Sequence, residues 1–416
     1  MTNNSTYRQG IVYALIYFFV NNLGLPHGLL YTAILTPIFI YWIYKNCELK
    51  SLIAWSLLAA LPISVEWISG TRNTSFLVSS GLLFTAIVFG FAAKIFIRKF
   101  NEDLPKLFRT VLIINGLLLI PAVITLFIPP VRELMWFMIP ISPGIPAFPR
   151  LEMFTYEPSY YGFLMAPVFI YFLLKALNGQ IKHWLLVVGV IGFSLLLSLS
   201  FGIIGGIGLS FLITLLLYFH KVTAVYKKVL FYGISASAAV LVSLFLIWPD
   251  NPVYQRIANI FTGEDTSANG RLYTSFMFAY HLIRENDALV FGIGPGQIKL
   301  LAHELIINYY NYTGDYAKVV RIPNANAEML ATFGFYGLFL KLGLEAYFFK
   351  RQKLHRNAFN LTLFIFMFVY QFTGSFLVNV VEIGGWMLAF YARFPSLDWT
   401  YLQQQSNPTT PKPKTE

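Results

Sequence analysis

The sequence has few cysteines and few charged residues, and each shortage excludes a class of protein. Its one cysteine, Cys47, excludes an intramolecular disulfide and a metal site built from several cysteines. Charged residues make up 12% of the chain, against about a quarter in soluble domains. His27, His281 and His303, on the predicted outer side, share no metal-ligand spacing. We therefore predict a protein unlike a soluble domain, with no metal site and no cofactor.

Long hydrophobic runs make up most of what is present. Hydrophobic residues account for 57% of the 416 residues. A transmembrane helix needs about 20 mostly apolar residues to cross about 30 Å of hydrocarbon. We therefore predict an all-α polytopic membrane protein with about twelve transmembrane helices. The candidate spans are residues 10–25, 28–44, 52–67, 75–96, 107–128, 159–177, 184–201, 203–219, 229–248, 328–349, 359–376 and 385–394.

One long polar interruption divides these spans. Residues 250–325 are rich in Arg, Tyr and Gly, and we expect them to form an external loop that contains short surface helices. Before this loop, residues 1–249 form a membrane domain of about nine spans with a shorter external loop at 129–158. After it, residues 326–395 hold the last three spans. Residues 396–416 are predicted to be a cytoplasmic tail, which we expect to be disordered because it is polar and proline-rich.

The distribution of basic residues predicts the orientation. Most of the 30 Lys and Arg residues fall in alternate short connectors, and such connectors are cytoplasmic by the positive-inside rule. Both termini are therefore predicted to be cytoplasmic, and the loops 129–158 and 250–325 to lie outside. The net charge of +11 follows mainly from this bias. Because the basic residues are spread over several connectors, the sequence predicts a lipid bilayer as partner and no nucleic acid.

The first candidate site is the segment RLEMFTYEPSYYG, which begins at Arg150 at the outer mouth of the sixth span. Proline suits the first turn of a helix, so its EPS sequence places Glu157 at the N-cap and Tyr160 and Tyr161 one turn further. Two interpretations remain open. In one, Glu157 caps the helix and Arg150 anchors at the lipid headgroups. In the other, these residues bind a sugar at the lipid–water boundary.

Two glycine-rich segments have structural interpretations. SLSFGIIGGIG at residues 198–208 permits a tight turn and close helix packing between the seventh and eighth spans. FGIGPGQ at residues 291–297 is interrupted by Pro295 and follows no buried strand, so it is not a dinucleotide-binding fingerprint. We interpret it as a backbone turn.

The long loop supplies most of the charged candidates. Residues 252–261, 270–284 and 297–309 show apolar residues at helical spacing, and we expect short helices with arginines near the height of lipid phosphates. The loop ends in RIPNANAEMLATFGFYG, which leads into the tenth span. The candidates in the loop are Arg256, Arg271, Arg284, His303, Arg321, Asn324 and Asn326. His303 is either a general base or an ordinary surface histidine.

Lys341 and Glu345 lie one helical turn apart within the tenth span. An unpaired charge there costs about 2.5–3.5 kcal/mol on insertion scales, and such residues usually pair inside the bundle. A mutual ion pair is one interpretation, and the ion-coupling site of a transporter is the other.

The order of these features resembles the bacterial O-antigen polymerase (Wzy) family, which is related to the O-antigen ligases. The shared features are an arginine before EPSxxG, the SLSFG turn, and a long loop with a Gly-Arg pair, FGIGPG and an Asn-rich segment before ATFGFYGL. The resemblance covers most of the chain from about Arg150 onward. Ligases carry a His near the Asn-rich segment and an Arg in the Gly-rich turn, where this chain has Asn324, Asn326 and Phe201. The difference favours a polymerase.

The resemblance implies an enzyme of the bacterial inner membrane that acts at the outer face without metal or nucleotide. Its substrate would be an oligosaccharide repeat unit on undecaprenyl diphosphate. The growing glycan would pass from its lipid diphosphate to a hydroxyl of the next lipid-linked unit. A chain-length regulator and a flippase would be its protein partners.

The resemblance and the chemistry together suggest roles for the candidates. Arg271 and Arg256 would neutralise the diphosphate, because a planar guanidinium binds phosphate oxygens in pairs. Glu157 would be the general base or a sugar ligand. The residues expected to hold the second lipid-linked substrate or its sugars are Arg150, Arg321, Tyr160, Tyr161, Asn324 and Asn326, with Arg284 and His303 completing the set.

Two alternatives remain. A ligase or a protein O-oligosaccharyltransferase would differ only in its acceptor. A transporter or flippase would use Lys341 and Glu345 as its coupling pair, and should place its polar residues near the bilayer midplane.

Overall fold

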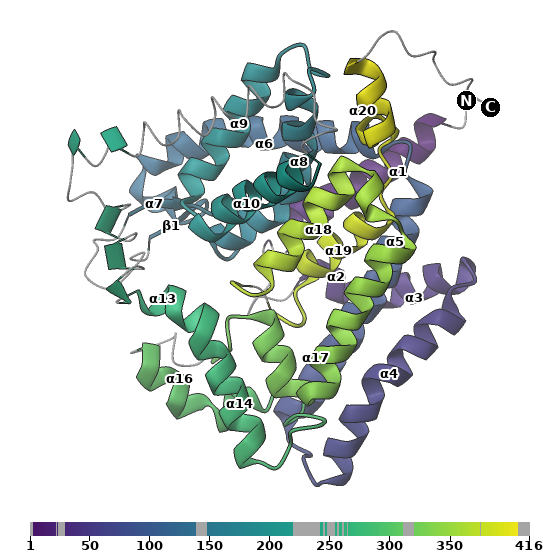
Figure 1. Cartoon of the computed structure of the whole chain (residues 1–416), viewed down its shortest axis with the longest axis vertical. Helices are drawn as coiled ribbons and strands as arrows, with labels where there is room; N and C mark the ends of the chain where they lie inside the picture. Colours follow the sequence, from purple (N-terminus) through teal and green to yellow (C-terminus); the bar gives the residue numbers. More distant parts are fainter. Residues whose placement is uncertain are drawn as a thin grey trace.

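The computed structural model describes residues 3–21, 23, 30–138, 148–218, 242–243, 246–247, 254–255, 258–259, 262–263, 265–310, 320–374 and 376–406. Within these ranges most of the chain is helical, and turns and loops join the helices (Figure 1). The β structure consists of one antiparallel pair of two-residue strands, β1 (Trp136–Phe137) and β2 (Arg150–Leu151), and an isolated bridge between Asn357 and Asp398. The expected span at 229–248 lies almost wholly outside the described residues.

Six of the described helices are long and apolar enough to cross a membrane, judged by length and composition. They are α4 (Leu49–Ile68), α5 (Thr74–Lys99), α6 (Leu104–Leu126), α8 (Pro158–Leu177), α10 (Phe201–Tyr218) and α17 (Ala325–Arg351). Shorter apolar helices are α9 (Trp184–Ser198), α18 (Ala358–Tyr370) and α19 (Val380–Tyr391). The protein is therefore an all-α membrane protein.

The two N-terminal spans differ from their expected form, because each consists of short pieces. The first comprises α1 (Asn3–Leu15) followed by one π-helical turn, η1 (Ile16–Val20). The second comprises α2 (Tyr31–Ile34) and α3 (Thr36–Lys45), which are separated at Leu35.

Helix α8 lies at the centre of the bundle. Most of its residues are buried, and it packs against α6, α9, α10, α18 and α19. The reason is in the sequence, since a helix that is apolar on all sides is stable only when neighbours cover it. Its N-terminus, at Pro158, is therefore held firmly at one end of the bundle.

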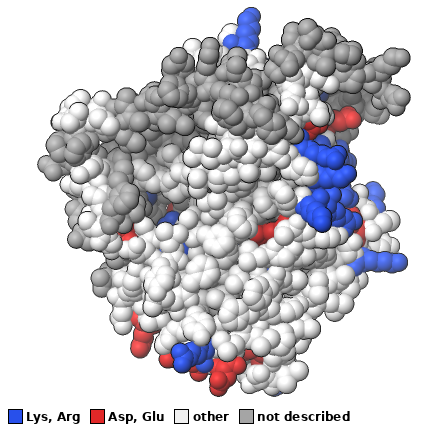
Figure 2. Space-filling model, in the orientation of Figure 1, with Lys and Arg blue, Asp and Glu red and all other residues white. Residues whose placement is uncertain are grey.

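The connectors predicted to be cytoplasmic gather at one end of the bundle, which we call the inner end. Nζ of Lys94 lies 2.8 Å from Oε1 of Glu48, and a guanidinium nitrogen of Arg98 lies 3.5 Å from the same oxygen. Arg393 joins this end through its backbone to Asn101 and through its side chain to Gln352. Figure 2 shows Lys and Arg side chains clustered on the right, where Figure 1 draws the end of α5.

The long loop gathers at the opposite end, which we call the outer end. There the side chains of Asn73, in the connector between α4 and α5, and Gln297, in the long loop, form a hydrogen bond of 2.8 Å. Figure 1 places the loop helices α13, α14 and α16 far from α20 and the chain termini. The alternation of connectors along the sequence is thus reproduced by the fold.

The long loop folds into a small helical unit with its own hydrophobic core. Its elements are α13 (Thr266–Asn269), the π turn η3 (Gly270–Thr274), α14 (Ser275–Glu285), α15 (Ile298–Leu301) and α16 (His303–Tyr310). Residues such as Ile283, Ile306 and Ile322 pack with the first turns of α17. The helix expected at 270–284 is confirmed, and that expected at 297–309 is divided at Ala302. The helix expected at 252–261 lies mostly outside the described residues.

The FGIGPGQ segment and the two residues before it hold a break in α17. Within the segment, the amides of Ile293 and Gly294 donate to the carbonyl oxygens of Ala331 and Thr332. Gly334 has φ 61° and ψ −161°, so the helix is interrupted in its outer half. The freed amides of Phe335 and Tyr336 donate to the carbonyl oxygens of Leu289 and Val290, each at 3.0 Å. A Cβ on Gly334 would lie 2.4 Å from the Val290 oxygen, so only glycine fits. The predicted backbone turn is confirmed, and its role is to complete the hydrogen bonds of a broken helix.

The other glycine-rich segment is used differently from the prediction. The tight turn between α9 and α10 is made by Leu199, whose φ is 45°, while the glycines lie inside α10. Their expected role in close packing is confirmed at Gly206, where a Cβ would lie 3.1 Å from a ring carbon of Phe366.

The C-terminal tail begins with ordered structure, which corrects the prediction that residues 396–416 are disordered. The turn η6 (Pro395–Leu397) is followed by α20 (Trp399–Ser406). Trp399 and Leu402 are buried, and the Trp399 ring stacks on Tyr218 at 4.9 Å between centroids. Two apolar side chains thus anchor a segment whose composition is otherwise polar. Residues 407–416 lie outside the described residues.

Candidate functional site

The polar residues of the first motif lie at the outer mouth of α8. Glu157 occupies the predicted N-cap position, with extended backbone angles, φ −163° and ψ 155°. Its carboxylate nevertheless accepts no hydrogen bond from a helix amide. Instead, Oε1 accepts a hydrogen bond of 2.5 Å from the Ser159 hydroxyl. The position is thus confirmed, while capping does not explain why the residue is a glutamate.

A second carboxylate, Glu152, lies beside Glu157 and was not among the predicted site residues. Burial and then the charge of Glu157 raise the pKa of Glu152, Arg150 lowers it, and the net result is a pKa of about 7. The β1–β2 pair fixes this segment, because Arg150 pairs with Phe137 across the strands and its guanidinium lies 5.0 Å from that ring. A carboxyl group with this pKa can both hold and release a proton near neutral pH.

Tyrosines connect these carboxylates to the rest of the site. The rings of Tyr156 and Tyr160 lie 4.5 Å apart between centroids. Tyr156 lies within electrostatic range of Glu157, Tyr160 and Arg321. Tyr370, at the end of α18, lies within electrostatic range of Arg271 and Glu157. Arg271 and Arg321 therefore approach the motif at Glu157 from the loop unit.

Arg271 is held in place through its backbone. The side-chain amide of Asn324 donates to the carbonyl oxygens of Arg271 and Phe372, each at 2.7 Å. Its oxygen accepts hydrogen bonds from the amides of Asn326 and Ala327 and so caps α17. Asn324 thus joins η3, α17 and the segment after α18. Because Asn324 is fully buried and both ends of its amide are used, it positions Arg271 and does not face a glycan.

Arg321 lies on the other side of the same mouth. Its guanidinium carbon is 4.8 Å from the centre of the Phe376 ring, and the residue is exposed. In the part of the chain that the structure describes, neither Arg271 nor Arg321 lies within 4.0 Å of a carboxylate oxygen. We call Glu152, Tyr156, Glu157, Arg271 and Arg321 the outer cluster. It presents two guanidinium groups and two carboxylates, a set that can bind an anion and accept a proton.

Several predicted residues lie away from this cluster. Arg284 is at the far end of α14, and His303 is at the end of α16 opposite Tyr310. Tyr161 is buried in the bundle, where its hydroxyl donates to Oδ1 of Asn115 at 2.7 Å. Arg256 lies outside the described residues. Of the predicted set, the structure brings together Glu157, Arg271 and Arg321, with Arg150 and Tyr160 beside them.

Asn326 faces a separate polar group in the interior. Its oxygen accepts a hydrogen bond of 3.1 Å from Nζ of Lys341. The predicted ion pair is confirmed, with Lys341 at 2.8 Å from Glu345, and Glu382 of α19 lies 3.6 Å from the same Nζ. Gln371 bonds to both Lys341 and Glu345. We call these five residues the inner cluster. Nothing in the sequence spacing linked Glu382 or Gln371 to Lys341.

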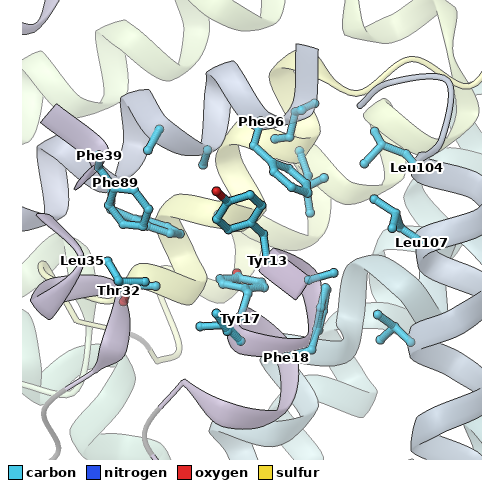
Figure 3. Close-up of a pocket in the computed structure, with 18 of the residues that line it drawn as sticks. Tyr13, Tyr17, Phe18, Thr32, Leu35, Phe39, Phe89, Phe96, Leu104 and Leu107 are labelled. Carbon is cyan, nitrogen blue, oxygen red and sulfur yellow. The ribbon is translucent and has the colours of Figure 1, made fainter. Parts of the chain in front are cut away.

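An apolar cavity of about 110 Å³ lies between η1, α3, α5 and α6. Figure 3 shows the rings of Tyr13, Tyr17, Phe89 and Phe96 around it. None of the described residues that line it is charged, so it offers no partner for a diphosphate. The described residues also contain no group of three or more His, Cys, Asp or Glu placed to hold a metal ion. No family model matches the sequence, and no curated protein matches it significantly.

Proposed function

We propose that the protein is a glycosyltransferase that polymerises lipid-linked oligosaccharides at the outer face of the bacterial inner membrane. Its donor would be a glycan on undecaprenyl diphosphate, and its acceptor a sugar hydroxyl of the next lipid-linked unit. The observation that carries the proposal is the outer cluster at the end of a membrane bundle. There Tyr156 lies within electrostatic range of both Glu157 and Arg321, and Tyr370 lies within electrostatic range of both Arg271 and Glu157. Glu152 lies beside Glu157.

The chemistry of the transfer needs these groups. The acceptor oxygen forms a bond to the anomeric carbon, while the bond from that carbon to the diphosphate breaks. The leaving diphosphate gains negative charge, which Arg271 stabilises through paired hydrogen bonds. The proton of the acceptor hydroxyl passes to a carboxylate, for which Glu157 is the candidate. This set of residues performs the reaction without a nucleotide.

The location of the polar groups supports an enzyme over a transporter. The outer cluster lies at the end of the bundle, where a lipid-linked substrate has its headgroup. The charges of the inner cluster contact one another, as expected for a structural network. A ligase would use the same donor site, so the acceptor distinguishes it from a polymerase.

The direct test uses purified full-length protein and undecaprenyl-diphosphate-linked repeat units. We expect products that differ in length by one repeat unit, formed equally well with EDTA present. Arg271→Ala should form them about 100- to 1000-fold more slowly. Transfer only to lipid A core or to a protein acceptor would replace the polymerase with a ligase. No transfer to any of these acceptors would refute the proposal.

The orientation is tested by cysteine labelling in intact spheroplasts. We expect a membrane-impermeant thiol reagent to label a cysteine placed at Thr262 or Thr71. Native Cys47, exposed at the inner end, should be labelled only after lysis. Labelling of Cys47 alone in intact cells would reverse the orientation and place the outer cluster in the cytoplasm.

A further inference from the structure

A second cationic site lies at the outer end, separate from Arg271. A cavity of about 70 Å³ is lined by Lys299 of α15, by Arg321, which precedes α17, and by Glu328 in the first turn of α17. Gly296 also lines it. Partial burial lowers the pKa of Lys299, and the nearby Arg321 lowers it further, whereas Glu328 opposes both. One carboxylate thus faces two cations. An anion that entered between Lys299 and Arg321 would be stabilised by both.

Directly inward from this site is a larger and almost wholly apolar cavity. It has a volume of about 300 Å³ and lies between α4 and α17, with residues of α5 and α19 at its base. Trp55 and Phe348 stack across its inner end, 6.2 Å apart between ring centroids. Partway along, the Tyr336 hydroxyl donates to the Leu58 carbonyl oxygen at 3.3 Å, so the two helices are bridged without being packed together.

The two cavities are neighbours, because Leu83 and Leu377 line both. Their order along α5 shows the direction, since Ser79 lines the polar cavity and Ile87 the apolar one. On α17 the apolar wall runs from Met329 to Phe348, which is about 28 Å of helix at most. A cationic mouth above a long apolar slot matches the shape and polarity of a lipid that carries a phosphate.

We propose that these cavities bind one polyprenyl diphosphate, with its phosphates at Lys299 and Arg321 and its isoprenoid chain between α4 and α17. The choice of an isoprenoid rests on the proposed function. The charge of Lys341 does not oppose the chain, because Glu345 and Glu382 contact its ammonium group. A polymerase needs two lipid-linked substrates at once, and this site holds one while the other lies at Arg271.

The test is photo-crosslinking of purified full-length protein with a farnesyl diphosphate that carries a diazirine at the end of its chain. We expect labelled peptides from α4 and α17. Unlabelled farnesyl diphosphate should compete at least tenfold better than either farnesol or inorganic diphosphate, because both the headgroup and the chain are bound. Labelling confined to the cavity of Figure 3, or equal competition by farnesol, would overturn the proposal.

Two variants sharpen the test. Ala59→Trp should fill the apolar cavity and Lys299→Gln should remove one cation, and each should weaken binding at least tenfold. Leu117→Trp, on an exposed face of α6, is the matched control and should bind normally. Unchanged affinity in both test variants would refute the site. If binding follows this pattern but no polymer forms, the lipid site is supported and the proposed function is refuted. If polymer forms but the label is found elsewhere in the protein, the proposed function is supported and the lipid site is refuted.

Discussion

The outer and inner clusters contain the same kinds of charged group but use them in opposite ways. In the inner cluster, Nζ of Lys341 lies within 4 Å of two carboxylates, so its charge is already paired and is not open to a ligand. At the outer cluster, within the described chain, Arg321 acts on Tyr156 and Arg271 acts on the neighbouring Tyr370, and neither arginine forms an ion pair. Burial explains the difference. A charge inside the bundle must be paired because it is out of contact with water, whereas a charge at the mouth of the bundle is solvated and can remain unpaired until a ligand binds.

The comparison separates stability from activity. Replacing a member of the inner cluster should lower the stability of the fold, because it leaves a buried charge without its counterion. Replacing Glu157 or Arg271 of the outer cluster should lower activity and leave the fold unchanged, because no buried partner is left behind; Glu152, which is partly buried, is treated separately below. Four predictions test this division, from the largest effect to the smallest.

Lys341→Met should destabilise the protein most. It leaves Glu345 and Glu382 without their ammonium group, and breaking a buried pair costs about 3–5 kcal/mol. Thermal unfolding of the purified protein in detergent measures the loss. Lys106→Met is the control, since the exposed Lys106–Asp103 pair contributes less than about 1 kcal/mol. Equal stability of the two variants would show that the inner cluster does not stabilise the fold.

Arg271→Ala should lower the polymerisation rate about 100- to 1000-fold, the usual effect of removing a group that stabilises developing charge. The amount of protein in the membrane should not change. Arg271→Lys should restore little, because an ammonium group lacks the paired geometry of a guanidinium. Arg284→Ala, at the far end of α14, is the control and should retain activity. A Lys variant with normal chain length would reduce Arg271 to a general surface charge.

Glu157→Gln should lower the rate at least about 100-fold, because the amide cannot accept the proton of the acceptor. Its carboxylate caps no helix amide, so the substitution should change the free energy of unfolding by less than about 1 kcal/mol. The polysaccharide ladder and a melting curve together separate the two effects. Full-length ladders from the Gln variant would remove Glu157 from the mechanism and make Glu152 the next base to test.

Glu152 should produce the smallest effect, a pH dependence of stability. Its folded pKa of about 7 lies above its ordinary value of 4.5, so the folded state holds the proton more tightly. Its contribution to stability is therefore greatest below about pH 4.5 and is lost as pH rises through about 7. The difference in melting temperature between the unchanged protein and Glu152→Gln should follow this curve. A difference independent of pH would contradict the raised pKa.

The sequence was sufficient where the determining contacts are local. The EPS sequence before an apolar run predicted the start of α8 and the position of Glu157. The spacing of Lys341 and Glu345 predicted their ion pair. Basic connectors predicted which helix ends lie together.

The sequence was insufficient where the determining contacts are distant. Arg321 approaches Tyr156, and Glu382 approaches Lys341, only because separate helices pack side by side. Periodicity carries no information on such pairs. Residues 399–406 likewise form a helix because Trp399 is buried against Tyr218 of α10, which is distant in the sequence. The polar composition of the tail gave no sign of this contact.

The break in α17 depends on hydrogen-bond acceptors that are synthesised before the helix itself. Leu289 and Val290, which accept hydrogen bonds from Phe335 and Tyr336, leave the ribosome about 45 residues earlier, a few seconds at about 5–20 residues per second. The acceptors are thus already made when the broken helix enters the membrane. Without them, its free amides would meet hydrocarbon, where each costs several kcal/mol. The long loop therefore supplies hydrogen-bond acceptors that the span following it lacks within its own helix.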